Sequence, residues 1–141
     1  MINARRAAVL PSLALAAALS AVLLPGTALA QFAPAPLTVD STARLAADGS
    51  VTLTGTYTCA PGSGPVLLDA EAFQGDRHAD LEGSLAVCDG RIHTWSATGR
   101  PGSGSFGPGA ARGEAVLMEL SKGLPFPVGV RTAHAELTLS R

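Results

Sequence analysis

Residues 50–59, SVTLTGTYTC, alternate strictly between two kinds of side chain. One face carries Val51, Leu53, Tyr57 and Cys59, and the other carries four threonines. A period of two with β-branched residues on the polar face is typical of a half-buried antiparallel strand. The pattern therefore places Cys59 on the buried side. The sequence APGSGP, which follows, predicts a turn directly after it.

Shorter runs of the same kind predict about seven strands in all and no helix. The expected strands are residues 37–45, 50–59, 66–73, 84–88, 91–98, 111–120 and 130–140. Residues 111–120 could also form a helix, but their neighbours favour a strand. GDRHADLEG, residues 75–83, is expected to be a loop. The number and spacing of the strands indicate an all-β chain, and we expect an antiparallel immunoglobulin-like β-sandwich.

The first thirty residues have the order of parts of a secretory signal peptide. Arg5 and Arg6 give a positive start, and an uncharged apolar stretch follows over residues 7–24. Residues 28–30, Ala-Leu-Ala, then offer the small residues that a signal peptidase needs. Because the apolar stretch nearly reaches spanning length, a retained membrane anchor is the alternative. We expect residues 1–30 to be cleaved and residues 31–141 to form a single secreted domain.

Cleavage would leave a mildly acidic domain. The chain has 10 Lys and Arg residues and 11 Asp and Glu residues. Without Arg5 and Arg6, 8 basic residues remain against 11 acidic ones, a net charge of about −3. Nucleic acids and anionic membranes both require a basic face. We therefore expect no nucleic-acid partner, no membrane association after processing, and a monomer.

The two cysteines, Cys59 and Cys88, are expected to form a disulfide. An even pair in an oxidising compartment is usually bonded. Closing a loop of about thirty residues should add roughly 3–4 kcal/mol to the stability of a small domain. A redox-active pair would need closer spacing and a lowered thiol pKa. Because Trp95 follows both cysteines, the bond is not the usual inter-sheet bridge of antibody domains, which surrounds the tryptophan in sequence.

Three stretches, VTLTGTYTC, CDGRIHTW and FGPGAARGEAVLMEL, together resemble an uncharacterised family of small exported actinobacterial proteins. The resemblance spans most of residues 37–140. It implies export, an immunoglobulin-like sandwich and one disulfide, and it implies no activity. VTLTGTYTCAPG is also similar to a stretch of the secreted subtilisin inhibitors, which carry two disulfides where this chain has two cysteines only.

Titratable side chains suggest one polar cluster. His93 shares a strand face with Trp95 and lies near Asp89 in sequence, so a carboxylate could hold the imidazole. The alternative is a packed or capped structural histidine. The other histidines, His78 and His134, have no metal-ligand spacing, and we expect no metal and no cofactor. The glycines of residues 102–107 fit G-x-G-x-x-G, but Pro108 follows where a dinucleotide site requires a helix.

No nucleophile elbow or carboxylate pair appears, so we expect a protein that is not an enzyme. The leading hypothesis is a secreted binding or cell-surface module, with an extracellular protein, a cell-wall component or a small molecule as partner. Its contact surface would be the loops 99–109 and 121–129, with Phe106 and Phe126 as exposed tips. Alternatively, both phenylalanines cover the ends of the core.

Two further functions remain open. A cleft between the sheets could carry a small apolar ligand, since many alanines and glycines could leave a cavity. An extracellular protease inhibitor would present the 121–129 loop, SKGLPFPVG, in a rigid extended form. Pro125 and Pro127 would stiffen that loop.

Overall fold

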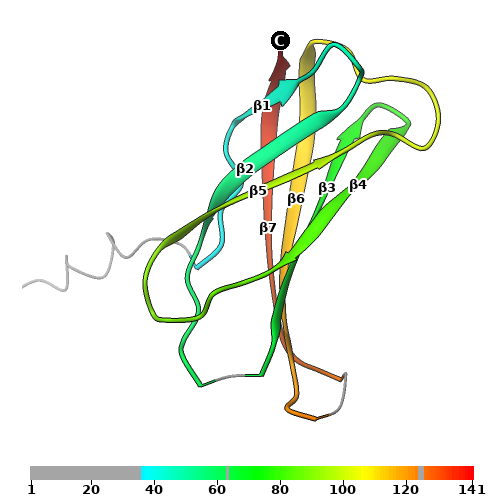
Figure 1. The fold of residues 1–141 in the computed structure, drawn as a ribbon. Coiled ribbons are helices and arrows are strands. Elements are labelled where there is room, and N and C mark those ends of the chain that lie inside the picture. The colour runs from blue at the N-terminus through cyan, green and yellow to red at the C-terminus, as the bar shows by residue number, and fades with distance from the viewer. Residues whose placement is uncertain (1–35, 63, 124–125) are drawn as a thin grey trace, which may run out of the picture. The chain divides into compact units, whose positions relative to one another are not determined.

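Seven strands and no helix make up the part of the chain that the computed structural model describes, residues 36–62, 64–123 and 126–141 (Figure 1). The strands are β1 (Thr42–Leu45), β2 (Val51–Tyr57), β3 (Val66–Gln74), β4 (Arg77–Leu85), β5 (His93–Gly99), β6 (Gly109–Leu120) and β7 (Pro127–Ser140). The all-β prediction is confirmed. The expected signal peptide, residues 1–30, lies outside the described residues. Among the described residues there is no helix that could cross a membrane.

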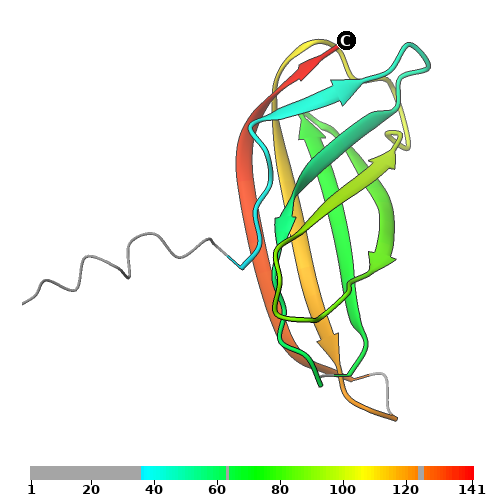
Figure 2. The ribbon, with the colours of Figure 1, turned by 60° about the vertical axis from the view of Figure 1, so that its left-hand side comes forward.

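One mixed sheet contains all seven strands, in the order β4-β3-β6-β7-β1-β2-β5 (Figure 2). Every neighbouring pair is antiparallel except β1 and β7, which run parallel with Ala43 beside Leu139. The expectation of a purely antiparallel arrangement is therefore wrong at this pair. The first strand joins β2 to the last strand, so the two halves of the sheet are continuous through β1.

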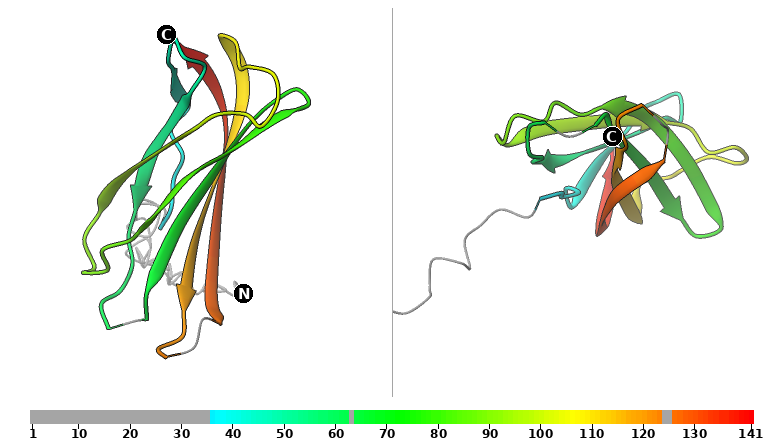
Figure 3. Two further views of the ribbon diagram at one scale, coloured as in Figure 1. Left: turned by 45° about the vertical axis from the view of Figure 1, so that its right-hand side comes forward. Right: turned by 90° about the horizontal axis from the view of Figure 1, so that it is seen from below.

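The two edge strands of this sheet, β4 and β5, approach each other (Figure 3). A Cβ atom placed on Gly99 of β5 would overlap the carbonyl oxygen of Asp80 in β4 and lie 2.9 Å from Cδ2 of Leu81. Glycine is required here because the backbone of one edge passes directly over the other. The sheet thus curls around one enclosed interior.

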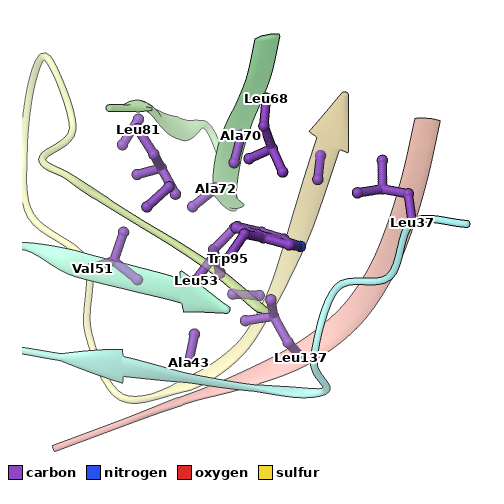
Figure 4. Packing of buried hydrophobic residues seen from close by; sticks show 14 of the residues in the cluster. Leu37, Ala43, Val51, Leu53, Leu68, Ala70, Ala72, Leu81, Trp95 and Leu137 are labelled. Atoms are coloured by element: carbon purple, nitrogen blue, oxygen red, sulfur yellow. The ribbon is translucent and has the colours of Figure 1, made fainter. Parts of the chain in front are cut away.

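The interior is filled by aliphatic side chains around a single tryptophan (Figure 4). Leu53, Leu68 and Leu139 are almost fully buried, and Trp95 is 5% exposed. The Trp95 indole Nε1 donates a hydrogen bond of 2.9 Å to the carbonyl oxygen of Thr38, so its polar atom is satisfied inside the core. The inward positions of β2 and β3 are those that the alternation predicts.

The bounds of two strands differ from those expected, and the structure decides between strand and helix for a third segment. Residues 75–83, expected as a loop, contain most of β4, and the predicted strand 84–88 overlaps only its last residues. The stretch 37–45 runs along β2, but its regular strand is shorter, Thr42–Leu45, with Leu37 in an isolated bridge to Tyr57. Residues 111–120 form a strand, as preferred over a helix.

Candidate binding surface

Three connections meet at one end of the described domain, and we call it the disulfide end. They are residues 58–65 between β2 and β3, residues 86–92 between β4 and β5, and residues 121–126 between β6 and β7 (Figure 1). The opposite end carries the β1–β2 and β3–β4 turns, the β5–β6 loop and the C-terminus.

The disulfide joins two of these connections. Cys59 follows β2 and is bonded to Cys88 in the β4–β5 connection, with Cα atoms 4.7 Å apart. The predicted bond is confirmed. Beside it, the N–H of Gly90 donates to the carbonyl oxygen of Cys59 at 2.9 Å. The β4–β5 connection is therefore tied to the end of β2 by one covalent and one hydrogen bond.

Tyr57, the last residue of β2, also holds this connection. Its hydroxyl oxygen accepts a 2.9 Å hydrogen bond from the backbone N–H of Val87. Its ring stacks on the His93 imidazole with centroids 5.4 Å apart. A tyrosine whose ring is buried and whose hydroxyl is satisfied by backbone fixes the loop that it contacts.

The contact between Asp89 and His93, which the sequence left open, is present. His93 Nε2 lies 2.7 Å from Asp89 Oδ1, which also accepts the backbone N–H of Arg91 at 2.9 Å. These bonds, the His93 contact first, lower the pKa of Asp89 below its ordinary value. Trp95 is not hydrogen-bonded to this pair, since its indole N–H donates to the carbonyl oxygen of Thr38. The pair closes the β4–β5 connection on itself and has the geometry of a structural clamp.

Six large apolar side chains project from this end into solvent. They are all of the exposed large hydrophobic residues of the described chain: Leu85, Val87, Ile92, Phe126, Val128 and Val130. Their exposed fractions range from 56% to 70%. Exposed apolar groups gathered on one region of a small domain usually mark an interaction site. A hollow of about 120 Å³ at this end is lined by Cys59, Val130 and Arg131 among others.

The expected contact surface of two loops is only partly supported by these positions. Loops 99–109 and 121–129 lie at opposite ends of the domain and cannot form one surface (Figure 2). The expectation of an exposed Phe106 is wrong, because this side chain is 5% exposed and belongs to the core. Gln74 fixes the same loop by bonding the N–H and the carbonyl oxygen of Gly107.

Phe126, in contrast, is 63% exposed at the disulfide end. Pro127 begins β7 opposite Leu120, and Pro125 lies outside the described residues. The N–H of Ser121 donates to the carbonyl oxygen of Phe126 at 2.9 Å, which closes the β6–β7 connection as a hairpin.

The remaining histidines are surface residues. His134 Nδ1 lies 3.3 Å from Glu114 Oε2, and His78 stacks on Phe73. In the described part of the chain, no three His, Cys, Asp or Glu side chains are gathered so that they could hold a metal ion.

Sequence reasoning missed Leu85, Val87 and Ile92 as surface residues. They flank the cysteine and the Asp89-Gly90 turn in LAVCDGRI, and this position in the sequence could have indicated that they are exposed. Apolar residues next to a turn and a disulfide have little room to turn inward, because the backbone there is fixed by the bond.

Comparison with known proteins identifies one family, whose function is unknown. Residues 34–141 match the model of DUF6299, a family of unknown function. No curated protein matches the chain.

Proposed function

Because the chain belongs to this family of unknown function, we propose its function from the surface just described. It is an exported, non-enzymatic binding module that contacts an extracellular protein or cell-wall component through the disulfide end. One observation carries the proposal: every exposed large hydrophobic side chain of the described residues lies at this end. Burying such side chains against a partner contributes about 25 cal/mol per Å² of apolar surface.

The rigidity of the β4–β5 connection supports the same function. Val87 and Ile92 are presented by a segment that the disulfide, Tyr57 and the Asp89–His93 contact hold in place. A preordered contact loop loses little conformational entropy when it binds. A segment that is held by so many bonds and still exposes apolar side chains is better suited to binding a partner than to a purely structural role.

The strand arrangement favours an immunoglobulin-like sandwich as the scaffold. The strands β4-β3-β6-β7 form one side and β2-β5 the other, with β1 between them in the sheet order. Loops at the ends of such sandwiches commonly carry binding sites. Export is supported by the disulfide, because bonds of this kind persist in oxidising compartments.

The alternative functions have less support. A carrier of an apolar ligand requires an apolar cavity of about 300 Å³ or more. The interior is occupied by Leu53, Trp95 and their neighbours, and the hollow of about 530 Å³ on the outer surface is lined by polar residues such as Thr52 and Arg44. A protease inhibitor requires an extended loop, whereas the β6–β7 connection is closed by the Ser121–Phe126 hydrogen bond.

Retention of a partner by immobilised protein tests the proposal. The protein obtained from the full-length chain is exposed to the secreted and cell-wall fractions of the organism that produces it. The double variant Val87→Ser/Ile92→Ser removes two apolar tips, and Ala47→Ser/Ala110→Ser is the matched control at exposed positions of the opposite end.

We expect a partner that the wild type and the control retain equally and that the Val87→Ser/Ile92→Ser variant retains at least tenfold less. Equal retention by all three proteins would contradict the proposed surface. If no fraction binds above the level of an unrelated β-protein, the proposed function is wrong.

A further inference from the structure

The outer face of the strands β4, β3, β6 and β7 continues the disulfide end with an unbroken apolar row. Cross-strand register places four side chains beside one another: Leu85, Leu67, Met118 and Val130. They alternate with inward residues such as Val66 and Leu117, so they face outward. Leu85 and Val130 are exposed, and Leu67 and Met118 are half-buried. The row crosses all four strands and adjoins the exposed tips described above.

Carboxylates occupy the same face farther along the strands. Register places Asp80, Glu71 and Glu114 side by side, and Asp69 lies one outward position closer to the apolar row on β3. Glu114 pairs with His134. Asp69, Glu71 and Asp80 are exposed and have no cationic partner among the described residues. Like charges directly opposite each other destabilise a sheet, so a cation brought to this row would relieve repulsion.

A hollow receives such a group. About 250 Å³ of space is lined by Asp69, Glu71 and Asp80, next to the irregularity in register between Leu68 and Ala70. This is room enough for the end of a lysine or arginine side chain, and the three acidic residues that line the hollow carry the opposite charge.

We propose that this outer face binds an extended, cationic segment of a partner protein, with apolar side chains on the row and basic side chains on the carboxylates. The proposal rests on the proposed function and names the partner's chemistry. Leu67 and Glu71 are four residues apart on one strand, which is about 13 Å at the rise of a β-strand. A matching segment therefore carries an apolar residue and a basic residue four positions apart, with a second basic residue between them.

A second copy of this chain is the competing occupant. Where the acidic rows of two copies (Asp80, Glu71 and Glu114, with Asp69 beside them) face each other, their carboxylates repel rather than attract. Charge complementarity therefore favours a basic partner over a dimer through this face.

The test uses a synthetic octapeptide, Leu-Thr-Val-Thr-Lys-Thr-Lys-Thr, acetylated and amidated. Its binding to the isotope-labelled protein is followed by NMR titration at about 50 mM salt. One control peptide carries Glu in place of both Lys residues, and another carries Ser in place of Leu and Val. The protein variants are Glu71→Gln and Val130→Ser. Asp76→Asn, in the β3–β4 turn, is the matched change of charge outside the face.

We expect shifts at the amides of the apolar row and of the acidic row, and no binding of either control peptide. Glu71→Gln should weaken binding about fivefold, an effect that higher salt removes, whereas Asp76→Asn should bind like the wild type. Val130→Ser should weaken binding at all salt concentrations. Circular dichroism shows that each variant is folded.

Three results would overturn the proposal: no binding of the octapeptide, equal binding by Glu71→Gln and Asp76→Asn, or a dimer in sedimentation that Val130→Ser dissociates. The partner-retention experiment separates the two claims. If Val87→Ser/Ile92→Ser abolishes retention of the natural partner and Glu71→Gln does not, the proposed function stands and this inference fails.

Discussion

Gly55 lies in the middle of β2, where two neighbouring groups leave no room for a side chain. A Cβ atom there would overlap the carbonyl oxygen of Thr38 and lie 2.6 Å from Trp95 Nε1. The same two groups form the hydrogen bond that satisfies the buried indole. Close approach of backbone and ring explains why a glycine interrupts the alternation of threonines and apolar residues on this strand.

Gly55→Ala should therefore lower the free energy of unfolding by about 1–3 kcal/mol or more, through overpacking and loss of the indole hydrogen bond. Gly102→Ala is the matched control, since nothing lies within 4 Å of its added carbon. We expect the control to stay within about 0.5 kcal/mol of the wild type in denaturant unfolding. Equal stability of the two variants would show that β2 can shift without cost.

Asp48 makes stability depend on pH at the acid end. The Ser50 hydroxyl and N–H donate to it and Arg100 pairs with it, which lowers the pKa of Asp48 to about 2. Because the folded pKa lies below the unfolded value, the contribution is fully present above about pH 4 and is lost as the pH falls toward 2. The melting temperature of Asp48→Asn should therefore fall less between pH 5 and pH 2 than that of the wild type. An unchanged acid dependence in the variant would contradict the assignment.

The loops 99–109 and 121–129 have similar sequences but differ in whether their phenylalanine is buried. Both are rich in glycine and proline and carry one phenylalanine, yet Phe106 is buried and Phe126 is exposed. Phe106→Ala should cost about 3–5 kcal/mol of stability, because it removes an aromatic ring from the core. Phe126→Ala should change stability by less than about 0.5 kcal/mol. Thermal unfolding of the two variants side by side decides the matter, and a similar loss in both would place Phe126 in the core as well.

The disulfide should act on one connection as well as on global stability. Cys59→Ala/Cys88→Ala opens a link with a sequence separation of 29, and we expect a loss of about 2–5 kcal/mol. The amides of Val87 and Gly90, bonded to Tyr57 and Cys59, should exchange hydrogen faster relative to the core of β2. Exchange that rises equally throughout would instead assign the bond a global role only.

How far the sequence predicts the elements depends on burial. β2 and β3 were predictable because alternate residues are fully buried, so the hydrophobic pattern is strong. β4 was missed because it is an edge strand that buries only Ala79 and Leu81, and the charges around them are typical of a loop. Contact of Asp89 with His93 was one of two interpretations that the sequence left open, because the two residues lie near each other in the chain. The burial of Phe106 and the outward row from Leu85 to Val130 depend on pairing between distant strands, which no local pattern encodes.

The whole molecule is closed by the pairing of its first and last strands. β1 contacts β2 on one side and β7 on the other, and β7 ends one residue before the C-terminus. The predicted antiparallel sheet could not include this parallel pair, because alternation within a strand indicates burial and not direction.

Processing of the N-terminus is the prediction that belongs to the whole chain. The Ala-Leu-Ala pattern of residues 28–30 predicts that the exported protein begins at Gln31. Mass spectrometry of the protein from culture medium should give the mass of residues 31–141 with two fewer hydrogens for the disulfide. Recovery of a form that still begins at Met1 from the membrane fraction would contradict cleavage.

The parallel β1–β7 pair also determines when the chain can fold. A nascent chain that lacks its last fourteen strand residues has no partner for one edge of β1 or for the long inner edge of β6. Contacts between the two ends of a chain are the slowest to form, because the intervening segment must first be ordered. The domain therefore cannot complete its fold until β7 has been synthesised, and a chain cut short before β7 has two open strand edges, which favour aggregation.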